Sequence, residues 1–208
     1  MYQIMVNKEA LRKVDEFTLP DTIGFGTVLT PVMIISDYQD GAWGPLKLEP
    51  YDNLSLNPTT KVLHYAQEIF EGMKGYLSPE GSPLLFRPDM NAKRFNYSAE
   101  MMAMPELPEE MYLNAAHAIT HLSKNLIPKE SGSSLYIRPF MFATDTSLGI
   151  KPSETFRFMV IASPSTSYFK TGDLNVFIER QGVRACPGGV GTAKTGGNYA
   201  ASLKSSKK

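Results

Sequence analysis

The sequence has a single cysteine, Cys186, so it can form no internal disulfide and no cluster of thiolates for a metal. It has no excess charge: 21 Lys and Arg residues balance 21 Asp and Glu residues, and no overall field favours nucleic acid or an anionic membrane. It also lacks an apolar run of about eighteen residues and a secretory apolar core near its start. These absences favour small-molecule chemistry, and they predict a cytoplasmic protein with neither nucleic acid nor membrane as a partner.

The predicted strands come from runs that are rich in β-branched and aromatic residues. The turn sequence DGAWG separates two of these runs, and the turn SPEGS separates the two short arms YL and PLLFR of a second hairpin. Two longer runs, SSLYIRPFMFAT and TFRFMVIAS, follow later in the chain. The strands are predicted at residues 27–38, 45–51, 76–77, 83–87, 133–144 and 155–163.

The predicted helices follow apolar spacings of three and four. In YAQEIFEGM this spacing joins Ala66, Ile69, Phe70 and Met73, which predicts a short helix over residues 65–73 that ends at Gly75. The other helices are predicted at residues 8–14, 90–104, where Asp89 is the expected N-cap, and 108–126, where Pro108 opens the first turn.

Several strands with helices between them in the first 165 residues predict an α+β fold. The segment STSYFKTGD interrupts the periodicity before NVFIE begins another strand, which is typical of a linker between domains. The predicted organisation is an N-terminal arm (1–24), an α+β domain (25–167), a linker (168–172) and the start of an incomplete second domain (173–208).

Two histidines, His117 and His121, lie four residues apart on a predicted helix, a spacing that can bind a metal. No Glu stands between them in a metalloprotease pattern, and the sequence offers no evident third ligand. We therefore expect a structural or solvated role for both, and no metal site.

The segment from Pro187 to Leu203, PGGVGTAKTGGNYAASL, is the richest in chemistry, because its glycines let the backbone approach a ligand closely. A phosphate-binding P-loop needs glycine directly before the lysine, where this sequence has Ala193. A lysine in such a pocket can lose its charge and react as a neutral amine. From the residues alone, Lys194 is either a Schiff-base lysine or a surface lysine on a glycine-rich loop.

Six strings, in the same order, resemble motifs of the branched-chain aminotransferases of the fold-type-IV pyridoxal-phosphate class. They span residues 25–203 and read FGTVLTPVMI, LHYAQEIFEGMKGY, FRPDMNAKRF, LYIRPFMFATDTSLGI, SPSTSYF and GTAKTGGNYAASL. The combination of FEGMK, YIRP and AKTGGNY is highly specific. The resemblance implies the small N-terminal α/β sandwich-type domain of that class, followed by the truncated start of a second domain.

The resemblance also implies roles for single residues. Lys194 resembles the lysine that binds pyridoxal 5'-phosphate as a Schiff base and then carries a proton. Arg94 resembles the arginine that grips the cofactor phosphate, and Tyr199 resembles the tyrosine that hydrogen-bonds the cofactor's phenolic oxygen. The substrate pocket is implied to contain the residues Phe25, Tyr65, Phe70, Tyr136, Arg138 and Tyr168.

The implied reaction transfers an amino group between leucine, isoleucine or valine and 2-oxoglutarate, giving glutamate and branched 2-oxo acids. Aromatic walls suit the branched side chains, and Arg138 suits the acidic side chain of glutamate. Leu148 and Ile150, in TSLGI, resemble a loop that closes over the neighbouring subunit's pocket, so the resemblance implies a homodimer.

Three alternatives remain at this point: the branched-chain enzyme, a sibling of the same fold such as a D-amino-acid aminotransferase or an aminodeoxychorismate lyase, and a truncated noncatalytic domain. FEGMK together with YIRP favours the first over the siblings. The resemblance further implies that the acid facing the pyridine nitrogen and the groups that bind the substrate α-carboxylate lie beyond Lys208. We therefore expect the 208 residues alone to be a fragment with little or no transaminase activity.

Overall fold

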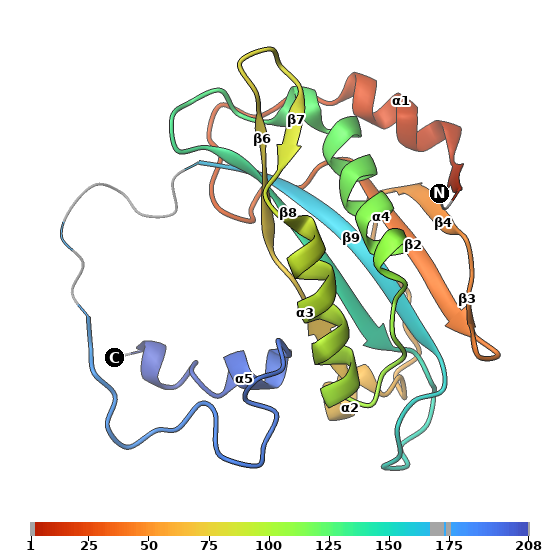
Figure 1. Ribbon diagram of the computed structural model, residues 1–208, viewed down its shortest axis with the longest axis vertical. Coiled ribbons are helices and arrows are strands. Elements are labelled where there is room, and N and C mark those ends of the chain that lie inside the picture. Colours follow the sequence, from red (N-terminus) through yellow and green to blue (C-terminus); the bar gives the residue numbers. More distant parts are fainter. Residues whose placement is uncertain (1–2, 167–172, 174–175, 208) are drawn as a thin grey trace.

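A mixed sheet organises the computed structural model, which describes residues 3–166, 173 and 176–207 (Figure 1). In these residues nine strands form one sheet in the order β1-β4-β2-β9-β8-β6-β7, with β3 paired to β2 and β5 paired to β8. Only β1 and β4 run parallel, and the other pairs are antiparallel. The strands are β1 (Ile4–Val6), β2 (Val32–Gln39), β3 (Ala42–Trp43), β4 (Leu46–Pro50), β5 (Glu68–Phe70), β6 (Met73–Leu77), β7 (Pro83–Leu85), β8 (Ser134–Ala143) and β9 (Phe156–Ser165).

Helices cover one face of this sheet. Figure 1 shows α3 and α4 crossing that face, and α1 lies beside β2 and β4. The helices are α1 (Lys8–Glu16), α2 (Val62–Tyr65), α3 (Pro88–Met101), α4 (Glu109–Leu122) and α5 (Gly196–Ala200), with 3₁₀ turns at Lys124–Leu126 and Ser205–Lys207. Their apolar side chains and those of the strands form the main core, in which Phe95, Ile119 and Phe158 are fully buried.

The other face of the sheet positions the candidate site. Side chains alternate along β8, so Leu135 and Ile137 belong to the core under the helices while Tyr136 and Arg138 face the opposite side. A smaller apolar cluster forms on that opposite side, around Met159. The sheet therefore separates a helix-covered core from a more open polar and aromatic face.

Most of the predicted elements are confirmed, including the hairpin around SPEGS and the long antiparallel pair of β8 and β9. The helix predicted over residues 65–73 is wrong. Here α2 ends at Tyr65, β5 follows, and Gly75 lies inside β6 instead of ending a helix. The apolar spacing of three and four is also met by a strand whose Ile69 is buried in the core, and pairing with β8 decides between the two structures.

Two smaller predictions are also wrong. Asp89 lies in the first turn of α3 and makes no cap, since the N-cap position is Arg87, in the left-handed region. Residues 176–179 form no strand, and Val176, Phe177 and Ile178 are exposed. The predicted linker at residues 168–172 lies outside the described residues.

No helix in the described part of the chain is long and apolar enough to cross a membrane. Figure 1 shows residues 176–207 returning to the rest of the chain, with α5 near the end of α3. This return brings Lys194 to the sheet, because the residues before α5 contact β5.

Candidate functional site

The segment that carries Lys194 is held to the sheet and to α3 by its backbone. The Phe70 amide donates to the Lys194 carbonyl at 3.0 Å, and the Lys194 amide donates to Ser98 Oγ at 2.9 Å. Inside the segment, the buried amide group of Asn198 donates to the carbonyls of Val190 and Ala193, each at 2.7 Å. The glycine-rich loop therefore has a defined conformation around the lysine.

The amine of Lys194 lies beside two packed aromatic rings at an open surface. Its Nζ donates to Tyr199 Oη at 2.6 Å, and it lies 4.5 Å from the centroid of the Phe70 ring and 4.9 Å from that of Tyr199. Tyr199 is 43% exposed, and its ring centroid lies 4.9 Å from that of Phe70. The structure thus brings together three of the residues predicted from the sequence.

Arg94 forms a paired fork with a carboxylate that the sequence analysis did not single out. Its Nε and Nη2 both donate to Glu71, the second at 2.8 Å, and Glu71 is completely buried while the Arg94 side chain is 54% exposed. Asn91 and the Gly72 amide donate to the same carboxylate. Hydrogen bonding to Glu71 raises the pKa of Arg94 further above its ordinary value. Two of the five guanidinium N–H donors are used by Glu71, so both hydrogens of Nη1 and the second hydrogen of Nη2 remain for another anion.

Ser98 connects Arg94 to the lysine segment. It lies one turn after Arg94 on α3, where its hydroxyl donates to the Arg94 carbonyl at 3.0 Å and accepts the Lys194 amide. Tyr97, on the same helix, shares a hydrogen bond with Thr192 at 3.1 Å. The guanidinium of Arg94 and the amine of Lys194, a hundred residues apart in the sequence, therefore lie on segments that contact each other.

Arg138 lies on the opposite side of Phe70 from the helices. Its guanidinium carbon is 4.5 Å from the Phe70 ring centroid, and Nη2 donates to Tyr136 Oη at 2.8 Å. The Nε of Arg138 is buried and has no hydrogen-bond partner among the described residues. Phe25 packs edge-on against Tyr136, with ring centroids 4.9 Å apart.

Two cavities flank this arginine. One, of about 160 Å³, is lined by Phe25, Tyr136, Arg138 and Ile161. The other, of about 210 Å³, lies against Glu68, Phe70 and the same arginine. Four of the predicted substrate residues, Phe25, Phe70, Tyr136 and Arg138, therefore form one aromatic and cationic surface beside the lysine. Of the other two, Tyr168 lies outside the described residues and Tyr65 lies elsewhere.

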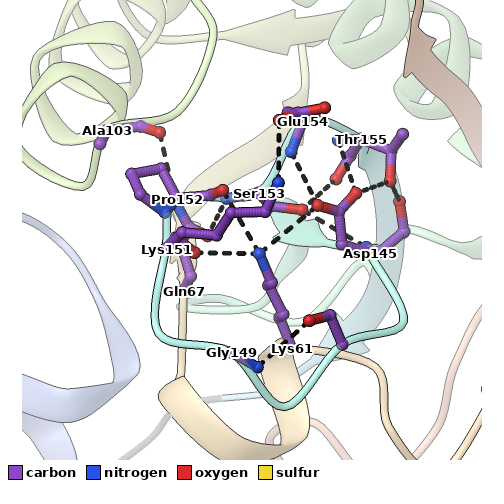
Figure 2. Close-up of polar contacts among 12 residues, drawn as sticks. Lys61, Gln67, Ala103, Asp145, Gly149, Lys151, Pro152, Ser153, Glu154 and Thr155 are labelled. Atoms are coloured by element: carbon purple, nitrogen blue, oxygen red, sulfur yellow. Dashed lines mark hydrogen bonds and ion pairs between the residues drawn. The ribbon is translucent and has the colours of Figure 1, made fainter.

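Tyr65 is not part of this surface and instead contacts the loop between β8 and β9. Its hydroxyl donates to the Leu148 carbonyl, and the loop exposes Leu148 and, at 90%, Ile150. A polar network shown in Figure 2 anchors this loop: the buried amine of Lys61 donates to the carbonyls of Lys151 and Pro152 and pairs with the Asp145 carboxylate. The loop is thus held at its base while its apolar tip faces outward.

Asp145 accepts several hydrogen bonds in that network. Burial acts to raise its pKa, but donation from Thr155 and the Glu154 amide, together with the charge of Lys61, outweighs burial and holds the pKa below its usual value. Gln67 joins the loop to α3 through the Ser153 amide and the carbonyls of Met102 and Ala103.

Glu68 and Glu71 are site residues that the sequence analysis missed. Both fall within EIFEG, for which a helix was predicted; a strand assignment would have placed Glu68 beside Phe70 on one face. The predicted histidine pair is exposed on α4, and the described residues contain no group of three or more His, Cys, Asp or Glu side chains suited to a metal.

Comparison with known proteins gives consistent results, although no protein-family model matches the chain. Over 193 residues the chain is 47% identical to branched-chain-amino-acid transaminase 1 of Bacillus subtilis, a match that covers 91% of this chain and 54% of that protein. The solved branched-chain aminotransferase of Thermoproteus uzoniensis with norvaline has a TM-score of 0.62 and 20% identity, over 84% of this chain and 55% of that one. This second likeness shows the fold alone.

A further solved branched-chain amino acid aminotransferase, complexed with N-(5'-phosphopyridoxyl)-L-glutamate, has a TM-score of 0.56 and 26% identity. That match covers 81% of this chain and 52% of the other. The chain spans about half the length of the relatives that it matches.

Proposed function

This chain is a relative of the branched-chain-amino-acid aminotransferases over about half of their length, and from that premise we propose that Lys194 holds pyridoxal phosphate. We further propose that the protein containing this chain moves amino groups between leucine, isoleucine or valine and 2-oxoglutarate. The observation that carries the proposal is the Lys194 amine, which donates to Tyr199 Oη at 2.6 Å beside the Phe70 ring.

The residues present fit the cofactor. The lysine amine is at an open surface, and the adjoining Arg94 keeps free N–H donors on Nη1 and Nη2, which suit phosphate oxygens. Glu71 occupies Nε and one hydrogen of Nη2. Glu71 in return fixes the orientation of the guanidinium.

Pyridoxal phosphate, when bound, supplies an aldehyde that links to amines and a ring that withdraws electrons from the amino-acid Cα. The rest of the proposed chemistry belongs to this chain. The Lys194 amine would take the proton from the substrate Cα and pass it to the cofactor carbon, and the hydrogen bond to Tyr199 orients the amine beside the two rings. The rings exclude water from one side of the nitrogen.

The substrate surface supports both partner substrates. Phe25, Phe70 and Tyr136 offer apolar area for a branched side chain. Arg138 lies between the two cavities with its buried Nε available, and a carboxylate is the group that would satisfy this donor. We therefore propose that Arg138 binds the side-chain carboxylate of glutamate and 2-oxoglutarate.

Other parts of the proposal concern the larger protein. Leu148 and Ile150 are exposed on an anchored loop, which supports a role in covering the pocket of a second copy in a homodimer. The domain boundaries at residues 167 and 173, and a cytoplasmic location, remain predictions. So does the expectation that the 208 residues alone turn over little substrate.

The proposal is tested on the longer protein that contains this chain, by loading it with pyridoxal phosphate, adding one amino acid, and measuring the 2-oxo acid formed in a single turnover. Leucine, isoleucine and valine should give product with the wild type and none with Lys194→Ala. D-Alanine is the comparison substrate for the sibling chemistry. A faster reaction with D-alanine than with leucine would contradict the assignment to branched-chain substrates.

Arg138→Ala separates the two partner substrates in the same measurement. It should reduce product formation from glutamate much more than from leucine, because only glutamate carries a second carboxylate. Equal losses for both amino acids would refute the role proposed for Arg138.

A further inference from the structure

Strand β5 uses its two edges for different partners. Along one edge it pairs with β8, as Gln67 accepts from Ala143 and Glu71 donates to Pro139 in the flanking positions. The other edge receives the segment before α5: the Phe70 amide donates to the Lys194 carbonyl, and Thr195 Oγ1 donates to the Glu68 carbonyl at 2.7 Å. The lysine segment therefore takes the place of a neighbouring strand.

The Glu68 side chain adds a third connection along this edge. Its carboxylate accepts a hydrogen bond from the amide of Gly196, two residues after the lysine. The contact is so close that a Cβ at Gly196 would lie 2.4 Å from Glu68 Oε1, whereas a Cβ at Gly197 would meet nothing within 4 Å. The fit between Glu68 and glycine at position 196 is thus specific to that position.

Glu68 also belongs to the substrate surface. It lines the cavity of about 210 Å³ together with Phe70 and Arg138. Burial raises the pKa of Glu68, while donation from Gly196 and Thr195 and the positive charge of Arg138 oppose that rise. A partly buried carboxylate placed between the lysine segment and the arginine has more than a packing role.

We propose that Glu68 is a positioning residue, whose carboxylate holds the Gly196 amide and thereby fixes the Lys194 amine beside the rings of Phe70 and Tyr199. The role assigned to Lys194 rests on the proposed function, but the positioning of its segment does not. A backbone amide held at position 196 limits how far the Lys194 backbone can move along β5. The Lys194 side chain is restricted to the same extent.

Five variants, two of them controls, test this arrangement. Glu68→Ala removes the acceptor, whereas Glu68→Gln keeps an amide oxygen that can accept the same hydrogen bond. Gly196→Ala forces the carboxylate away, and Gly197→Ala adds the same methyl group one residue later in open space. Glu154→Gln, at a side chain that is 79% exposed on the β8–β9 loop, controls for loss of a glutamate charge.

The first measurement needs no cofactor. It is the rate of amide hydrogen exchange of residues 194–198 in each variant, measured at the same temperature interval below that variant's own unfolding midpoint. Glu68→Ala and Gly196→Ala should exchange about tenfold faster than wild type, because a hydrogen bond to a carboxylate is lost. Glu68→Gln, Gly197→Ala and Glu154→Gln should match the wild type. Unchanged exchange in Glu68→Ala would overturn the proposal, and if that variant does not fold, the pair Gly196→Ala and Gly197→Ala decides it.

The second measurement adds pyridoxal phosphate, reduces the imine with borohydride and quantifies modification at Lys194 by peptide mass. The yield at Lys194 should fall at least about fivefold in Glu68→Ala and recover in Glu68→Gln. If the wild type shows no preference for Lys194 while the exchange result holds, the proposed function fails and the positioning by Glu68 stands. If the wild type prefers Lys194 and Glu68→Ala does so equally, the positioning role is refuted and the proposed function stands.

Discussion

Arg94→Ala should destabilise the fold, because it leaves the fully buried carboxylate of Glu71 without its counter-charge. Glu71 accepts two hydrogen bonds from Arg94, one from Asn91 and one from the Gly72 amide, so the variant removes half of its donors and all of its nearby positive charge. Breaking a buried ion pair at one partner costs about 3–5 kcal/mol. Because the Arg94 side chain is 54% exposed, water can enter the vacated space, and we expect the lower end, about 3 kcal/mol.

For a chain of this size, a loss of about 3 kcal/mol corresponds to a fall in the unfolding midpoint of about 6–12 °C. Thermal unfolding followed by circular dichroism, without cofactor, measures it. Arg12→Ala is the matched control, since Arg12 pairs with Glu9 on the exposed face of α1 and its loss should change little.

A second arm replaces both partners. The double variant Arg94→Met with Glu71→Gln carries no buried charge and should recover at least half of the midpoint lost in Arg94→Ala. Equal midpoints for Arg94→Ala and Arg12→Ala would refute the argument from burial. This result also matters for function, because a loss of cofactor binding in Arg94 variants can be assigned to the phosphate only after stability is matched.

Two other predictions follow from close contacts and from charge. Gly72→Ala places a Cβ 2.3 Å from Tyr136 Oη and should cost about 1–3 kcal/mol; adding Tyr136→Phe removes the closest contact and should recover part of the loss, and a double variant no more stable than Gly72→Ala would contradict this. Asp145 has a lowered pKa in the folded state, so its contribution to stability is present above about pH 4 and is lost as the pH falls further. Asp145→Asn should therefore lower stability at pH 7 and flatten its fall in acid, and an unchanged acid profile in denaturant unfolding would contradict this.

The long strands could be predicted from the sequence because their pattern is local and strong. In β8 and β9 apolar side chains recur on the core face over ten residues each, and no helix accounts for that pattern as well. The segment with β5 could not be predicted in this way. Its apolar spacing fits a helix and a strand equally, and the choice is made by hydrogen bonds to β8, about seventy residues later.

The candidate site also has a part that could be predicted from the sequence and a part that could not. The lysine, its tyrosine and the arginines could be recognised because their local motifs resemble those of a known family. The positions of these residues relative to one another could not be predicted. Glu68 contacts Gly196 across 128 residues of sequence, and Arg94 contacts Glu71, which lies in the segment wrongly predicted as a helix. Such contacts depend on the packed sheet, where a single carboxylate can be buried only if donors from several elements converge on it.

The most direct test of the account is the site at which pyridoxal phosphate attaches to the purified chain. The cofactor would be added at low excess, the imine reduced with borohydride, and every lysine-containing peptide quantified by mass spectrometry. The structure provides Lys194 with a tyrosine partner, two aromatic rings and a nearby guanidinium, so modification should concentrate at Lys194 and vanish there in Lys194→Ala. Modification spread evenly over the exposed lysines, with Lys194 no more reactive than Lys204 or Lys207, would contradict the central claim.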